Sequence, residues 1–130
     1  WQLDAGEAAA FAQRLKQSYE ISAPSVETQA RLLSGGNLQR LILAREITAQ
    51  PKAMIAMQPT QGLDVGAVEV VHRLLLEQRQ QGVAILLISE ELDELLSLSD
   101  RVAVIYEGAI VGEVTDGDIE KIGQLMTGSV

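Results

Sequence analysis

The sequence has 130 residues, 47% of them hydrophobic and 22% charged, so it can build a folded domain or part of one and is not typical of a disordered chain. Its 10 Lys and Arg against 18 Asp and Glu give a net charge of −8, which lacks the basic stripe that nucleic-acid binding needs. With no Cys and a single His, it excludes disulfide frameworks, thiol catalysis and multi-His or Cys metal sites. The longest apolar run, Val83–Ile88, is too short for a membrane span, and no signal segment opens the chain. We therefore expect a soluble, intracellular protein that does not bind nucleic acid.

Two helices are predicted in the first 50 residues. Asp4, followed three residues later by Glu7, is typical of a helix start. A second helix is predicted from Asn37 to Thr48, and it must end before Pro51. The first helix carries an apolar stripe that we expect to be buried as one face: Ala8, Phe11, Ala12, Leu15 and Tyr19.

Three short apolar runs predict strands at Ala53–Met57, Val83–Ser89 and Val102–Tyr106. Because apolar residues in these runs are continuous rather than alternating, we expect parallel strands that are covered on both faces. Glu107-Gly108 predicts a turn into a last strand, Ala109–Val114, that closes a hairpin.

Helical segments separate these strands. The first is predicted from Gly66 to Gln81 and ends at Gly82, and the second runs from Glu90 to Leu98 with Ser89 as its cap. A short helix is expected within residues 116–126. The alternation of strands and helices predicts an α/β fold with a mostly parallel sheet, flanking helices and right-handed crossovers.

Two stretches carry candidate chemistry. Ser34 and the two glycines after it directly precede a predicted helix, and such a corner can bind phosphate through free N–H groups and the helix dipole. The same residues could equally form an ordinary serine cap. The other stretch follows strand 53–57, at a strand end of the kind where α/β sheets bind ligands, although its Asp64 could simply cap the next helix.

In order and spacing, these stretches resemble the second half of an ABC-type nucleotide-binding domain. Leu33–Gln39 resembles the LSGGQ signature, Ala53–Gln58 the Walker B strand, and Gly62–Asp64 the D-loop. Ser89–Leu92 falls where that family has its switch histidine, and Asp100-Arg101 opens the strand that usually follows.

The resemblance extends over residues 29–112. The segment PTQGLDVGA, residues 59–67, is most similar to the second cassette of bacterial simple-sugar or nucleoside importers. It implies a partial P-loop NTPase fold, with residues 1–50 belonging to the helical signature subdomain and 51–130 to the C-terminal part of the ATPase core. In this family each ATP lies between the P-loop of one cassette and the signature of the other. The resemblance therefore implies a set of nucleotide-contacting residues: Ser34, Gly35, Gly36, Asn37, Gln39 and Asp64.

The sequence departs from the family at three catalytic positions. The Walker B strand normally ends in Asp then Glu, which bind magnesium and activate the attacking water, but Met57 and Gln58 stand here. Neither can take a proton from water or balance the charge of a divalent ion. Glu90 replaces the switch histidine. With these three positions substituted, we expect no intact catalytic residue and no metal ligand in this chain. Because a missing general base alone typically costs ~10²–10⁴ in rate, the chain's own site should hydrolyse ATP poorly.

The P-loop is also missing. Its lysine must follow a glycine, whereas Lys16, Lys52 and Lys121 follow Leu, Pro and Glu. We expect the missing half to precede residue 1 and the chain alone to be inactive. Since the P-loop strand normally lies between the second and third strands predicted above, its absence should leave a gap in the sheet. The unpaired edges favour a homodimer of the chain, paired at an edge or swapped.

The resemblance thus implies part of an ABC importer's ATP-binding subunit, peripheral on the cytoplasmic face of the membrane. It would supply its signature to a partner cassette and couple ATP binding and hydrolysis to sugar or nucleoside uptake through a permease. ATP and Mg²⁺ would be bound only in the intact cassette dimer. Two alternatives stay open: an ABC-type ATPase module of a non-transport machine, and an interaction module that has lost nucleotide chemistry.

Overall fold

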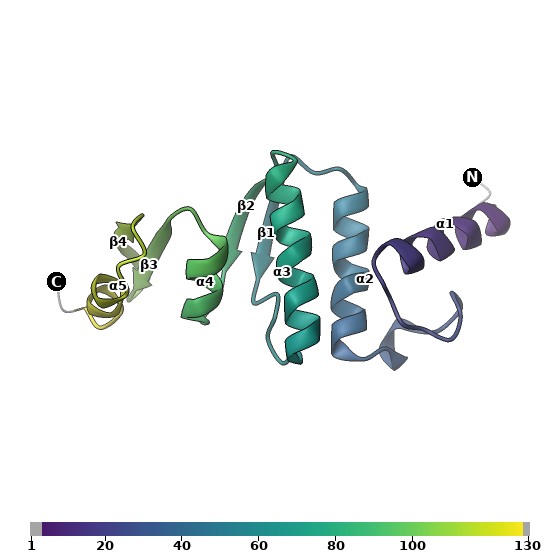
Figure 1. The fold of residues 1–130 in the computed structure, drawn as a ribbon, viewed down its shortest axis with the longest axis horizontal. Helices are drawn as coiled ribbons and strands as arrows, with labels where there is room; N and C mark the ends of the chain where they lie inside the picture. The colour runs from purple at the N-terminus through teal and green to yellow at the C-terminus, as the bar shows by residue number, and fades with distance from the viewer. Residues whose placement is uncertain (1–3, 129–130) are drawn as a thin grey trace. The chain divides into compact units, whose positions relative to one another are not determined.

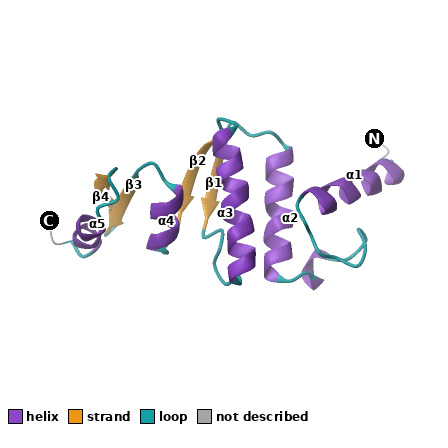
Figure 2. Ribbon diagram, viewed as in Figure 1, coloured by secondary structure: helices purple, strands orange, loops and turns teal. Residues whose placement is uncertain are grey.

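The computed structural model describes residues 4–128 (Figures 1 and 2). Its helices are α1 (Ala5–Ser18), the short 3-10 helix η1 (Ala30–Leu32), α2 (Gly35–Thr48), α3 (Val65–Gln80), α4 (Leu92–Leu98) and α5 (Ile119–Met126). Its strands are β1 (Ala53–Met57), β2 (Ala84–Ile88), β3 (Val102–Tyr106) and β4 (Ala109–Val114). No helix among residues 4–128 is both long and apolar enough to cross a membrane.

The chain divides into two units, the first ending at Ile88 and the second beginning at Ser89. Each unit is a compact group whose residues contact mainly one another. This division differs from the expected boundary at residue 50, which concerns roles within the family's domain and stays a prediction.

In the first unit, β1 and β2 pair in parallel, from Ala53 opposite Ala84 to Met57 opposite Ile88. Helix α3 connects them and packs against α2, and the two helices lie side by side in Figure 1. The buried residues of this unit come mainly from these two helices: Leu43, Ala44, Ala67, Val71, Leu74 and Leu75. This core therefore holds the start of α2, where Ser34 and the two glycines after it lie, next to the start of α3.

The expectation that the parallel strands are covered on both faces was wrong. Burial alternates along β1 and β2, and Ile55 is 73% exposed on the uncovered face. Within the first unit, helix α3 covers only one face of this two-stranded sheet, so every second apolar side chain stays exposed.

The buried face predicted for α1 was also wrong. Helix α1 has no buried residue: Ala8 and Phe11 are exposed, and Ala12, Leu15 and Tyr19 are half-buried. Instead of packing tightly together, α1, α2 and the segment between them line an open apolar hollow of about 720 Å³.

In the second unit, β3 and β4 form the predicted antiparallel hairpin, whose turn has positive φ at Glu107 and Gly108. Helices α4 and α5 contribute to its core, which is a cluster of apolar side chains: Val102, Val104, Val114, Ile122 and Leu125. Helix α4 begins two residues later than predicted, and its cap is not Ser89. The Ser89 hydroxyl accepts a hydrogen bond from Glu91 N (3.0 Å), which holds the turn before the helix, and Glu91 occupies the capping position.

The described strands form two separate two-stranded sheets, one parallel and one antiparallel, and β2 does not pair with β3. The α/β class is as predicted, but parallel pairing is confined to β1 and β2. The predicted gap for a missing strand between β2 and β3 stays a prediction. The edge-paired or swapped homodimer stays a prediction.

Candidate functional site

Ser34 is the N-cap of α2, as its position before two glycines predicts. Its Oγ accepts hydrogen bonds from Asn37 N (3.4 Å) and from Asn37 Nδ2 (2.8 Å). Both Ser34 and Gly35 are exposed. The first-turn N–H groups of α2 have no partner within the helix and carry the positive end of its dipole. The corner is therefore open to solvent and suited to an anion.

Gly36 sets how closely α2 approaches α3. A Cβ at position 36 would lie 2.8 Å from the Cβ of Ala67, whereas one at position 35 would lie 3.5 Å from Leu63 Cδ2. The first distance is too short for real side chains, so this approach needs a glycine. The two glycines thus differ: Gly35 lies on the open side of the corner and Gly36 forms the helix contact.

Asn37 ties the corner to a segment 15 residues earlier in the chain. Its Oδ1 accepts a hydrogen bond from Ser22 N (2.7 Å), while its Nδ2 donates to Ser34. Gln39, two positions later on α2, is half-buried. The four signature residues Ser34–Asn37 are therefore one structure, in which Asn37 faces inward and Ser34 outward.

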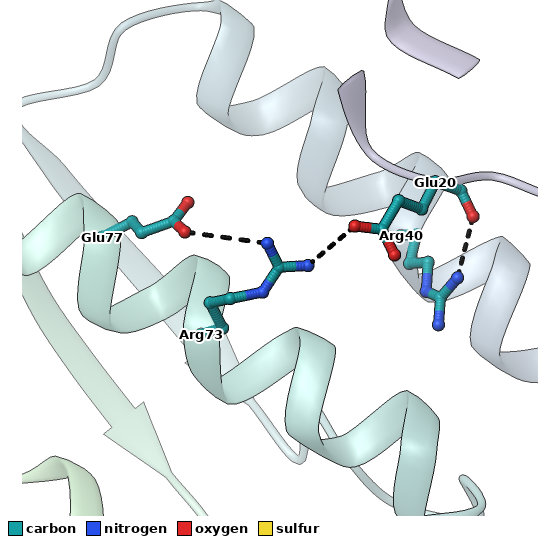
Figure 3. Close-up of polar contacts among 4 residues, drawn as sticks. All are labelled: Glu20, Arg40, Arg73 and Glu77. Atoms are coloured by element: carbon teal, nitrogen blue, oxygen red, sulfur yellow. Dashed lines mark hydrogen bonds and ion pairs between the residues drawn. The ribbon is translucent and has the colours of Figure 1, made fainter. Parts of the chain in front are cut away.

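A polar network supports the same segment (Figure 3). Arg40 NH1 donates to the carbonyl oxygen of Glu20 (2.8 Å), and Arg73 of α3 pairs with the Glu20 carboxylate (3.1 Å). Arg73 also lies 3.9 Å from the Glu77 carboxylate, one turn along α3. Glu20 thereby joins α2 to α3 behind the corner. Sequence reasoning missed these residues because their separations follow no motif.

Asp64 is the N-cap of α3, and its Oδ1 accepts a hydrogen bond from Ala67 N (3.0 Å). Because Ala67 is also the residue that Gly36 contacts, the D-loop cap and the signature corner meet at one place. The structure therefore brings together two stretches that lie 30 residues apart in the sequence.

Met57 and Gln58 lie at the carboxyl end of β1. Met57 is 71% exposed, and Gln58, with positive φ, extends the pairing by donating from its N to Ile88 O (2.8 Å). A neutral thioether and a neutral amide do not supply the negative charge with which carboxylates balance Mg²⁺, and neither accepts a proton from water. Among the described residues no group of acidic or His side chains could hold a metal ion. Glu90 lies in the second unit, exposed, before α4.

Comparisons with known proteins agree with the motifs. A guanosine import ATP-binding protein of Bacillus subtilis is 49% identical over 98% of this chain, and a glucose import ATP-binding protein of Haloferax volcanii is 48% identical over 97%. A nucleoside import ATP-binding protein of Lactococcus lactis is 44% identical over 97%. The chain matches part of an ABC importer ATP-binding protein. It spans about a quarter of the length of these relatives.

Solved structures show the same fold. The dimeric structure of a bacterial ABC transporter cassette matches with a TM-score of 0.73 and 22% identity, over 88% of this chain and 50% of that one. A nucleotide-free ATP-binding cassette from an ABC transporter matches with a TM-score of 0.74 and 24% identity, over 98% of this chain and 49% of that one. No family model matches the chain. The fold is therefore the α/β fold of ABC cassettes, of which the chain covers a part.

Proposed function

We propose that this chain acts as part of an ABC importer's ATP-binding subunit and supplies the signature corner to ATP bound by a partner cassette. The observation that carries the proposal is the open Ser34 corner at the start of α2, in a chain that is 44–49% identical to sugar and nucleoside import ATP-binding proteins. The substrate of the whole subunit would be Mg-ATP, and its hydrolysis would drive uptake of a sugar or nucleoside.

The role of the corner follows from its chemistry. The hydroxyl of Ser34 and the N–H groups of Gly35 and Gly36 are donors at the positive end of the α2 dipole, and a terminal phosphate offers only acceptors. We propose Asn37, Gln39 and Asp64 as the remaining residues of the nucleotide site, Asn37 from behind Ser34 and Asp64 through the start of α3 beside the corner. The partner cassette would contribute the P-loop.

The chain's own catalytic positions are proposed to be degenerate. Met57 and Gln58 offer neither a carboxylate for magnesium nor a general base, and Glu90 would place a negative charge where the family has a histidine. Hydrolysis would therefore depend on the partner's catalytic residues, and this chain alone would be inactive.

The partners follow from the importers that it resembles. We expect a second ATP-binding cassette and a membrane permease, with the protein held at the cytoplasmic face of the membrane through that permease. Residues 1–50 would belong to the helical signature subdomain and 51–130 to the ATPase core.

ATP turnover of the full-length protein, assembled with its partner cassette and permease, tests the proposal. Ser34→Arg places a bulky cation at the corner and should abolish ATP turnover and transport. Ser18→Arg, at an exposed position at the end of α1, is the matched control and should leave both unchanged. Normal turnover by Ser34→Arg would refute the proposed role of the corner.

A further inference from the structure

The orientation of the Asn37 side-chain amide is fixed by its surroundings. Ser22 N lies 2.7 Å from one amide atom, and because a backbone N–H can only donate, that atom must be the oxygen. The atom 2.8 Å from Ser34 Oγ is therefore the amide nitrogen, which can only donate. Asn37 thus presents a donor, and never an acceptor, to the Ser34 hydroxyl.

This arrangement uses up the acceptor capacity of that hydroxyl. A serine hydroxyl has two acceptor positions and one proton to donate. Ser34 Oγ accepts from Asn37 Nδ2 and, at 3.4 Å, from Asn37 N. What is left to the exposed Ser34 is its O–H donor, which can bind only an acceptor such as a phosphate oxygen.

We infer that Asn37 is a positioning residue that holds the Ser34 hydroxyl as a donor toward the terminal phosphate, while its oxygen anchors the corner to Ser22. The inference rests on the proposed function and deepens it, because it assigns Asn37 to the hydroxyl of Ser34 rather than to direct contact with the phosphate. It also gives the corner its selectivity for an anion over a ligand that donates hydrogen bonds.

Asn37→Asp tests the inference without changing the shape of the side chain. One carboxylate oxygen still accepts from Ser22 N, so the anchor is kept. The other oxygen accepts where the amide nitrogen donated, so it binds the Ser34 proton and removes it from the phosphate. Because hydrogen bonds to charged groups are strong, kcat/KM for Mg-ATP in the assembled full-length protein should fall ~10- to 100-fold.

Two comparisons separate positioning from other effects. Gln13→Glu adds the same charge at an exposed position on α1 and should leave kcat/KM unchanged, and Asn37→Gln, which keeps the donor, should retain more activity than Asn37→Asp. In a Ser34→Ala background, Asn37→Asp should cost little further, since no hydroxyl remains to be turned. Thermal unfolding should show that Asn37→Asp is folded.

The outcomes distinguish this inference from the proposed function. If Ser34→Arg abolishes turnover but Asn37→Asp is fully active, the positioning role is wrong and the function stands. An equal loss from Asn37→Asp with and without the Ser34 hydroxyl would also overturn the positioning role. If Ser34→Arg itself has no effect, the proposed function fails first.

Discussion

At the scale of single residues, the contact between Gly36 and Ala67 determines how α2 meets α3. The two backbones approach so closely that a methyl group at position 36 would lie 2.8 Å from the Ala67 Cβ. Both carbons are attached directly to helical backbone, so neither can move away as the end of a long side chain could. The motif glycine therefore has a packing role that is independent of any ligand.

Substitution of the two glycines tests this packing role. Gly36→Ala should lower the free energy of unfolding by ~1–3 kcal/mol, because α2 and α3 must move apart. Gly35→Ala should be neutral or stabilising by ~0.5–1 kcal/mol, since its methyl group meets only ordinary contact and alanine favours the helix. Urea unfolding of the two variants measures the difference. Equal stability of both variants would contradict the contact.

Residue-scale features were only partly predictable from the sequence. The cap at Ser34 and the cap at Asp64 follow from local rules, and both are confirmed. The hydrogen bonds that Ser22 N donates to Asn37 and that Arg40 donates to Glu20 could not be predicted, because they join residues 15 and 20 positions apart whose approach depends on the tertiary fold.

At the scale of elements, the strand boundaries were the most predictable. Strands β1, β3 and β4 have the predicted bounds because short apolar runs there end at turn residues such as Glu107 and Gly108. Helix α4 starts later than predicted, because the Ser89 hydroxyl bonds to Glu91 N and forms a turn outside the helix. Which faces of the strands are buried could not be predicted from the apolar runs, since burial depends on whether a helix of the chain packs on each face.

The N-cap residues Asp64 and Asp118 form a matched pair for testing whether Asp64 does more than cap its helix. Asp64 and Asp118 cap α3 and α5 with equal 3.0 Å bonds, to Ala67 N and Lys121 N. Asp64→Ala and Asp118→Ala should each cost about 0.5–2 kcal/mol of stability. If Asp64 also serves the nucleotide site, only Asp64→Ala should lower ATP turnover. Calorimetric melting and ATPase assays on the pair measure both effects, and equal turnover would reduce Asp64 to a cap.

At the scale of the whole molecule, the exposed apolar face of β1 and β2 accords with a chain that covers only part of a cassette. Ile55, Met57, Leu86 and Ile88 are exposed on it, and the matched cassette structures are about twice as long as the part that this chain covers. Family and fold class were predictable from motif order. The exposure of this face within the first unit was not, because apolar runs look the same whether or not a helix covers them.

The most direct test of the central claim is the reactivity of a thiol at the corner. The chain has no cysteine, so Ser34→Cys introduces a single thiol into these 130 residues. In the assembled protein, a non-hydrolysable Mg-ATP analogue should slow alkylation of that thiol strongly, whereas Mg-ADP, which lacks the terminal phosphate, should not. Ser18→Cys on α1 should react equally with both nucleotides. Equal alkylation of Ser34→Cys with the analogue and with ADP would contradict the account.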